Sequence, residues 1–481
     1  MEPLAIPRGP RRADLFEVAV TDIDAEGFGL GRLSLLIGPQ REPRTYRVLV
    51  RKGVPGDVVQ AYVESSRSNR IEARIDSFIQ ESEDRVKPRC AHFSVKAEPG
   101  GGCGGCTFQS LEYQTQLKVK GDLVRRMLKT AHVDPDLVQP VQGMDDPWYY
   151  RNKMEFSFAE GPGGVSLGLH PTGYKYDVLD LEECFLETDW VAGFLATVRD
   201  WARERKLLTY RPKQSIGWLR TLTVRVGKRT GERQVELTTA PGGNREDVDD
   251  FARLVREYSA EHNVIFQSVY WTEHVAQRGH RTRMECEVLY GEAFFREEMR
   301  LPDGSNLSFE IHPRAFFQPN TIQAEKLYGL VVKRAALAGQ RVMDLYCGTG
   351  SIGLFLSRFA EHVIGIEMQP DAVENARRNA AHNGITNIEF HLGDVGTVLS
   401  EMSLTADVVV VDPPRSGLNP LAREMVELTG ASRMVYVSCN PASLARDLAG
   451  FHKTGWKTLS VEPIDMFPHT YHIENVAVLE R

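Results

Sequence analysis

The sequence predicts three parts: a small antiparallel β-barrel, a mixed α/β central part and a C-terminal doubly wound α/β domain. Three observations carry this prediction. The chain has 481 residues, which is too long for one ordinary core. Apolar and polar residues alternate with period two, between Gly and Pro turns, over residues 14–78. From about residue 305, strand-like and helical segments alternate regularly. We place the three parts at residues 12–80, 81–304 and 305–481.

The N-terminal and central parts differ in pattern. Short runs such as FEVAVTDI and YRVLV, with the turn VPGDVV between later runs, predict the barrel, a type of module that often binds single-stranded RNA. A helical segment over residues 111–131 then leads into strand-like pieces such as NKMEFSFA and helical pieces such as REDVDDFARLVREYSA. This mixture predicts a central α/β part.

Composition limits the class of protein. The chain is 42% hydrophobic, carries a formal charge of -7 and has no run of about 18 apolar residues, so we expect a cytoplasmic protein without a membrane span. Nucleic-acid contacts would then require local basic patches. Residues 201–231 form one, with nine Lys or Arg against Glu204 and with Tyr210 and Trp218 between them. This segment would either track RNA phosphates or form a solvated charged face.

The C-terminal pattern places a glycine turn and three acids at strand ends. The strand RVMDLY runs into Cys347-Gly348-Thr349-Gly350-Ser351, where glycines would let the backbone approach a ligand. Glu367 ends the next strand and suits ribose hydroxyls, and Asp394 ends the third, near an adenine amino group. The glycine turn alone fits a dinucleotide equally well, but the Asp412-Pro-Pro turn after the fourth strand disfavours a dehydrogenase.

Cys439 is the candidate nucleophile. It lies in YVSCNP, after an apolar strand and before a helix that Pro441 would begin, on the edge that carries the cofactor turn. The helix amides are expected to favour its thiolate. A buried structural cysteine is the alternative, which the polar neighbours Ser438 and Asn440 weaken.

A second set of cysteines predicts a metal centre. The chain has seven cysteines, an odd number that indicates a reducing compartment rather than a disulfide framework. Cys103 and Cys106 stand in a tight CGGC turn, with Cys90 upstream and Cys184 downstream. Four thiolates hold either zinc or an iron–sulfur cluster, and spacing alone does not choose. Cys286 and Cys347 are expected to be structural.

Together these segments resemble the RNA uracil-5-methyltransferase family, and most closely its iron–sulfur branch, which modifies large-subunit ribosomal RNA. The resemblance covers nearly the whole chain. Its motifs are FFQPN, DLYCGTGSIGL, GIE, DPPRSG, YVSCNPASLARD, MFPHTYHIENV and the CGGC segment. It implies a TRAM barrel, a central domain and a Rossmann-like domain that binds S-adenosylmethionine. The implied reaction methylates C5 of a uridine.

The resemblance also implies residue roles. Cys439 would attack C6 of the uracil, Glu474 would remove the C5 proton, and Asp412 would hydrogen-bond the ring or meet the cofactor. Phe316 would stack near a base that has left its helix. The cofactor would be lined by Gln318, Tyr346, Gly348, Ser351, Glu367, Asp394 and Asp412.

For the cysteines, the resemblance implies a [4Fe-4S] cluster held by Cys90, Cys103, Cys106 and Cys184. The twelve residues between Cys90 and Cys103 are about twice the family's usual gap, so Cys90 is the least expected ligand. The implied substrate is 23S ribosomal RNA and the implied state a monomer. Three alternatives remain: methylation of transfer RNA, methylation of C5 of cytosine, and a non-catalytic RNA-binding or assembly protein on the same scaffold.

Overall fold

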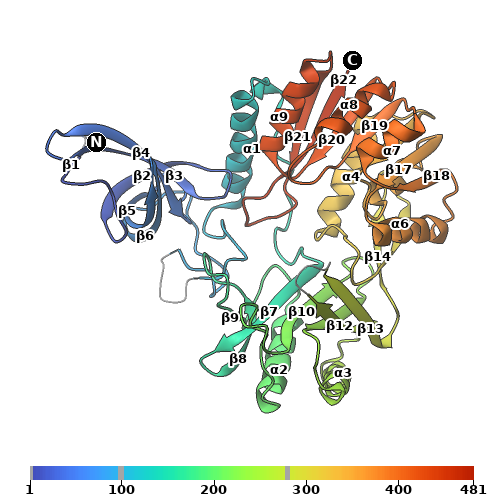
Figure 1. Cartoon of the computed structure of the whole chain (residues 1–481), viewed down its shortest axis with the longest axis horizontal. Helices are drawn as coiled ribbons and strands as arrows, with labels where there is room; N and C mark the ends of the chain where they lie inside the picture. The colour runs from blue at the N-terminus through green and yellow to red at the C-terminus, as the bar shows by residue number, and fades with distance from the viewer. Residues whose placement is uncertain (1–3, 96–101, 277–281) are drawn as a thin grey trace.

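The computed structural model describes residues 4–95, 102–276 and 282–481. It divides into a barrel, a central sheet with two helices, and a C-terminal sheet covered by helices (Figure 1). The predicted fold class is confirmed. Within the described residues, no helix has the length and apolar character needed to cross a membrane.

The N-terminal barrel closes where its last strand in the sheet order pairs with its first, and the apolar–polar alternation of the sequence does not predict that pairing. Its strands follow the order β3-β2-β5-β6-β4, and β4 also pairs with β3. Most neighbours are antiparallel, but β4 and β6 run parallel, and so do the short β1 and β3. The alternating apolar side chains, such as Val18, Val48 and Ile75, fill the interior. The strands are β1 (Leu4–Ile6), β2 (Leu15–Ile23), β3 (Gly29–Ile37), β4 (Glu42–Arg51), β5 (Val58–Arg67) and β6 (Arg70–Gln80).

The central sheet has seven strands in the order β13-β12-β11-β10-β7-β8-β9. Helices α2 and α3 bury Phe194 and Phe251 against this sheet. The elements are β7 (Lys153–Gly161), β8 (Gly164–Leu169), β9 (Leu179–Asp180), α2 (Trp190–Glu204), β10 (Leu219–Val226), β11 (Arg233–Thr239), α3 (Arg245–His262), β12 (Ser268–Val275) and β13 (Arg283–Gly291).

The C-terminal sheet has the order β18-β17-β16-β19-β20-β22-β21, with β22 antiparallel to both of its neighbours. Its strands are almost wholly apolar because helices cover both faces. The elements are β16 (Arg341–Leu345), α5 (Ser351–Leu356), β17 (His362–Glu367), α6 (Pro370–His382), β18 (Ile388–Leu392), α7 (Val395–Met402), β19 (Val408–Val411), α8 (Pro420–Leu428), β20 (Arg433–Ser438), α9 (Pro441–His452), β21 (Lys457–Ile464) and β22 (Glu474–Glu480).

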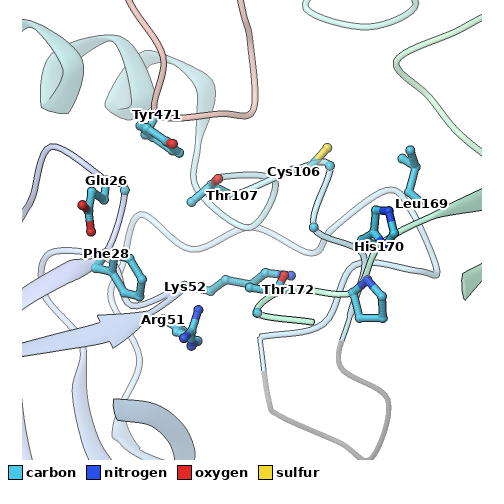
Figure 2. Close-up of a pocket in the computed structure, with 15 residues that line it drawn as sticks. Glu26, Phe28, Arg51, Lys52, Cys106, Thr107, Leu169, His170, Thr172 and Tyr471 are labelled. Carbon is cyan, nitrogen blue, oxygen red and sulfur yellow. The ribbon is translucent and has the colours of Figure 1, made fainter. Parts of the chain in front are cut away.

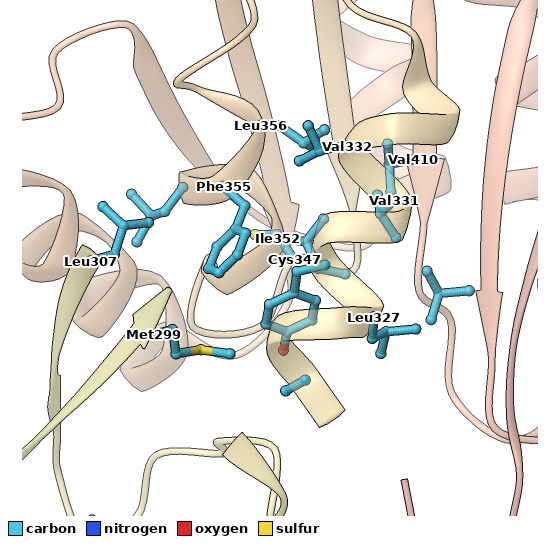
Figure 3. Close-up of a cluster of buried hydrophobic side chains, with 14 of the residues drawn as sticks. Met299, Leu307, Leu327, Val331, Val332, Cys347, Ile352, Phe355, Leu356 and Val410 are labelled. Carbon is cyan, nitrogen blue, oxygen red and sulfur yellow. The ribbon is translucent and has the colours of Figure 1, made fainter. Parts of the chain in front are cut away.

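Two segments that begin before residue 305 complete the C-terminal core. Helix α1 (Tyr113–Thr130) packs against α9, and the following stretch, with its short 3-10 helix η1 (Pro135–Leu137), bridges to β21. The hairpin of β14 (Phe295–Arg300) and β15 (Asn306–Ile311) buries its apolar face beside α4 (Thr321–Ala335) and α5 (Figure 3). The boundaries at residues 80 and 304 remain predictions. Helix α1 and β14 lie on the predicted central side of the second boundary and β15 on the C-terminal side, and all three pack with the C-terminal part.

Candidate active site and cysteine group

One edge of the C-terminal sheet collects the predicted site residues. Strands β18, β17, β16, β19 and β20 run parallel, so their carboxyl ends share this edge. Ligands of such sheets bind beyond the carboxyl ends of the strands. The residues at or just after those ends are Tyr346, Glu367, Asp394, Asp412 and Cys439.

The glycine turn has the conformation that glycine permits. Gly348 and Gly350 have φ of 54° and 77°, and a Cβ on Gly350 would come within 2.9 Å of the Phe390 ring. The Gly348 amide donates to Glu367 Oε2 at 3.2 Å, and the Gln369 amide donates to Oε1 at 2.8 Å. These bonds orient Glu367 toward the edge and leave each oxygen a lone pair for a ribose hydroxyl.

Two further cofactor candidates also have local structural roles. Tyr346 has a φ of 64°, uncommon for a bulky residue and typical of functional turns. Asp394 begins α7 as its N-cap, because its carboxylate accepts from the Thr397 amide at 3.1 Å. The cap occupies one oxygen of Asp394 and leaves the other for a ligand.

Asp344 is a site residue that sequence reasoning missed. It is fully buried beneath the glycine turn, and neither carboxylate oxygen has a well-aligned hydrogen-bond donor among the described residues. Burial and the nearby Asp412 together raise the pKa of Asp344 to about 7, against a lowering by the Gly353 amide. The sequence could have indicated Asp344, because it is the first residue of the motif DLYCGTG that contains the glycine turn.

Cys439 and Glu474 meet at the ends of two paired strands. Ser438 of β20 pairs with Asn475 of β22, and the side-chain amide of Asn475 donates to the Ser438 carbonyl at 3.1 Å. Because β22 runs antiparallel to β20, its first residue, Glu474, lies at the same edge as Cys439. The position of Glu474 therefore depends on the reversed strand, which the residues alone did not reveal.

The electrostatics of Cys439 differ from the expectation. Burial and the charges of Glu474 and Asp412 together raise its pKa to about 11, against a lowering by Arg415 and by a backbone hydrogen bond. The net direction is therefore opposite to the expected preference for a thiolate at the start of α9. Burial raises the pKa of Asp412 to about 7 and that of Glu474 well above its ordinary value. Both acids thus take up protons more readily than ordinary carboxylates, and a protonated acid no longer opposes the thiolate.

The loop before α4 borders this edge. Gln318 is buried, while the Phe316 side chain is 65% exposed. The Thr349 hydroxyl donates to the Phe316 carbonyl at 3.2 Å and ties this loop to the glycine turn. Phe316 also lines a cavity of about 360 Å³ together with Arg151 and Leu169. An exposed ring beside a cavity suits the predicted stacking on a base.

The four predicted metal ligands gather in one place, which we call the cysteine group: Cys90, Cys103, Cys106 and Cys184. Their charges influence one another, and burial raises the pKa of Cys106 to about 12 and that of Cys184 to about 11. Each sulfur has N–H groups directed at it, from the backbone near Cys90, Cys103 and Cys184 and from the Gln109 side chain at Cys106. The insert after Cys90 falls partly at residues 96–101, outside the described residues.

Two cations border the cysteine group. Lys52 of the barrel is buried, donates to the Cys103 carbonyl at 3.2 Å and lies 4.2 Å from the centre of the Phe93 ring. Figure 2 shows Lys52 and Cys106 on opposite sides of a pocket between barrel and cysteine turn. Arg151 interacts electrostatically with Cys106 and Cys184. No three His, Cys, Asp or Glu side chains of the described residues stand close enough together to hold a single metal ion.

The basic segment is largely neutralised. Five of its cations form ion pairs: Arg203, Arg205, Arg211, Lys228 and Arg229. Arg225 is buried and donates to two carbonyls, and Trp218 is buried as well. Residues 201–231 as a whole are therefore not one phosphate-binding track.

The doubly wound sheet, its glycine turn and the oriented Glu367 define a methyltransferase of the S-adenosylmethionine-dependent class. Residues 337–446 match a family model described as a methyltransferase domain. An uncharacterized RNA methyltransferase of Caldanaerobacter subterraneus is 35% identical over 98% of this chain and 99% of its own length. Another, of Protochlamydia amoebophila, is 36% identical over 89% of this chain and 98% of its own.

Among solved structures, the Pyrococcus abyssi tRNA (uracil-54, C5)-methyltransferase in complex with S-adenosyl-L-homocysteine aligns with a TM-score of 0.72. It is 26% identical and covers 96% of this chain and 100% of its own. The chain belongs to the RNA methyltransferase family.

Proposed function

We propose that this protein methylates C5 of a uridine in RNA, with large-subunit ribosomal RNA as its substrate and Cys439 as its nucleophile. The observation that carries the proposal is the juxtaposition of Cys439, Glu474 and Asp412 at the sheet edge that also bears the glycine turn. C5 of uracil is too weakly nucleophilic to take a methyl group directly. A thiol beside two acids supplies what the reaction needs, namely a nucleophile and a base.

In the first step the Cys439 thiol loses its proton to a nearby carboxylate, and its sulfur bonds to C6 of the uracil. The electron pair of the C5–C6 double bond then makes C5 nucleophilic. Bound S-adenosylmethionine supplies the methyl group that C5 takes up. Glu474 next removes the C5 proton, and the electrons of that C–H bond re-form the double bond and expel the Cys439 thiolate. The raised pKa of Glu474 makes it a stronger base than an ordinary carboxylate, which suits a group that accepts a proton.

The cofactor would lie along the edge from β16 to β18. Gly348 and Ser351 give a close backbone approach, Glu367 would accept from the ribose and Asp394 from the adenine amino group. Tyr346, Gln318 and Asp412 complete the proposed lining, and Phe316 would stack on the flipped uracil.

We further propose that the cysteine group holds a [4Fe-4S] cluster. The N–H groups aimed at the sulfurs are of the kind that tune such clusters, and the two bordering cations would offset its negative charge. Zinc is the alternative for four thiolates, and the family resemblance favours the iron–sulfur cluster. Such a cluster would order the fold and the RNA surface around it.

Ribosomal RNA is preferred because the barrel and the cysteine group accompany the ribosomal branch in the family resemblance. Transfer RNA is the second candidate, favoured by the similarity to the Pyrococcus tRNA (uracil-54, C5)-methyltransferase. Cytosine methylation is disfavoured because the nucleophile sits in a Ser-Cys-Asn-Pro turn with a DPPR partner. A non-catalytic binding protein would have no need of Cys439 and Glu474 together.

The test is methyl transfer from labelled S-adenosylmethionine to unmodified large-subunit ribosomal RNA and to bulk transfer RNA, with wild type beside Cys439→Ala. We expect 5-methyluridine in digested ribosomal RNA, with at least a thousandfold loss, as an order of magnitude, in the variant. Label on transfer RNA instead would keep the chemistry and change the substrate. Label in another nucleoside, or undiminished in Cys439→Ala, would refute the mechanism.

A further inference from the structure

A pocket on the outer side of the central sheet combines aromatic and basic side chains. Its volume is about 430 Å³, and it lies between β7, the loop before β9 and the loop before β10. The residues that matter here are His170, Lys175, Tyr176, Tyr210, Lys213 and Arg220. The pocket lies on the central sheet, away from the carboxyl-end edge of the C-terminal sheet that bears Cys439.

The two tyrosines are accessible and carry cations beside their rings. The Tyr176 side chain is 52% exposed, with the Lys213 amine 4.9 Å from its ring centre. The Arg220 guanidinium lies 4.3 Å from the centre of the Tyr210 ring. Such pairs present flat π surfaces next to positive charge, which is how proteins bind single-stranded nucleic acid.

Three cations of this pocket have no ion pair in the described part of the chain. Lys213 and Arg220 belong to the basic segment, and Lys175 precedes it. Among the described residues no carboxylate lies within 4.0 Å of their charged groups, whereas most of the other cations of the segment are paired. The acid in this lining, Glu160, is engaged by Arg211. The pocket therefore carries uncompensated positive charge, although the whole chain is acidic.

The pocket adjoins two others that extend to the loop before α4. His170 lines both this pocket and the one between barrel and cysteine turn (Figure 2), and it is fixed by hydrogen bonds to Ser157 and the Asp177 carbonyl. That second pocket shares Leu169 and Gly105 with the cavity beside Phe316. Three adjoining pockets thus extend from Tyr176 and Tyr210 to the loop before α4, which borders the candidate active site.

We propose that this pocket binds an unpaired nucleotide of the RNA several positions from the methylated one. Its base stacks on Tyr176 or Tyr210, and its phosphates contact Lys175, Lys213 and Arg220. The proposal rests on the proposed function only in requiring an RNA substrate, and it deepens it by assigning a positioning subsite outside the reaction centre.

The test compares Tyr176→Ala/Tyr210→Ala with Tyr174→Ala, a matched control because Tyr174 is 50% exposed on the same loop and lies outside the pocket lining. Binding is measured by fluorescence anisotropy with a labelled single-stranded RNA of about 20 nucleotides. Steady-state methyl transfer is measured with large-subunit ribosomal RNA. We expect Kd and KM to rise about tenfold or more in the double variant, with kcat unchanged. Lys213→Gln should lower the salt dependence of binding by about one phosphate contact.

Kd and KM of the double variant within twofold of the control, with both proteins folded by circular dichroism, would overturn the proposal. A fall in kcat at unchanged Kd would overturn it as well, because it would move the tyrosines into a different role. Failure of the proposed function is a separate outcome, since anisotropy reports RNA binding whichever nucleoside the enzyme modifies.

Discussion

Cys439 and the cysteine group share one property and differ in another. Burial raises the pKa of Cys439 and of all four cysteines in the group. The charges nearby are arranged differently. Glu474 and Asp412 raise the pKa of Cys439 and the exposed Arg415 lowers it, whereas the group has acids at its border, Glu183 and Glu187, together with the largely buried cations Lys52 and Arg151. The group therefore has buried cations beside its sulfurs, and Cys439 has an exposed one.

The difference fits two kinds of cysteine chemistry. Thiolates that bind a metal centre must keep their negative charge continuously, and buried cations supply permanent compensation. A nucleophile that is expelled in every cycle needs its charge only for a moment. The acids around Cys439 can take up the thiol proton and return to the charged form later, so their repulsion is not permanent.

The largest expected effect is at Glu474, and its absence would break the comparison between Cys439 and the cysteine group. In Glu474→Gln the attack by Cys439 remains possible, but the C5 proton cannot leave. We expect turnover to fall by about a thousandfold and a covalent protein–RNA species to accumulate. Denaturing gel electrophoresis with labelled ribosomal RNA would detect it as a slowly migrating band.

The matched control is Glu474→Gln combined with Cys439→Ala, which should show no such band because the nucleophile is absent. A band that persists in this double variant would assign the covalent link to another residue. Full turnover by Glu474→Gln would remove Glu474 from the role of base.

The second test concerns the group itself. Cys106→Ser should lose the bound iron and its visible absorption, and its free energy of unfolding should fall by several kcal/mol, since metal binding contributes to folding. Cys286→Ser is the control, because Cys286 lies on β13 apart from the group and accepts a hydrogen bond from the Thr272 hydroxyl at 3.3 Å.

Iron retained by Cys106→Ser, or lost equally from Cys439→Ser, would erase the distinction between the two cysteine environments. Zinc in place of iron in the wild-type protein would keep the ligand set and replace the cluster that we propose.

The sequence predicted those parts of the site that are local. The strand ends that carry Glu367 and Asp412, and the turn around Gly348, follow from patterns of a few residues. Cys439 was found for the same reason. The joining of α1 to the C-terminal sheet was not predicted, because an amphipathic helix does not say which core its apolar face will meet.

The sequence did not predict two features that depend on residues far apart in the chain: the position of Glu474 and the ion pairs of the basic segment. Glu474 reaches the site only because β22 enters the sheet in reverse, and its role came from family resemblance alone. The basic segment was one charge run in the sequence, yet ion pairs with acids such as Asp180 and Glu325 divide it into neutralised residues and a few free cations. Both outcomes depend on residues far away in the chain.

The smallest expected effect is at Arg415, a cation whose charge lowers the pKa of both Cys439 and Glu474. The proposed reaction uses the deprotonated form of each, so kcat/KM should rise with pH. Arg415→Gln should raise both pKa values and move that rise to higher pH. The pH profile of kcat/KM measures the shift, which should shrink at high salt because Arg415 is exposed.

Lys453→Gln, at the far end of α9, is the control and should leave the profile in place. A shift to lower pH in Arg415→Gln would contradict the prediction, because the loss of a positive charge cannot make either group easier to ionise. An unchanged profile would mean that Arg415 does not offset the carboxylates, and the contrast between Cys439 and the cysteine group would then be greater.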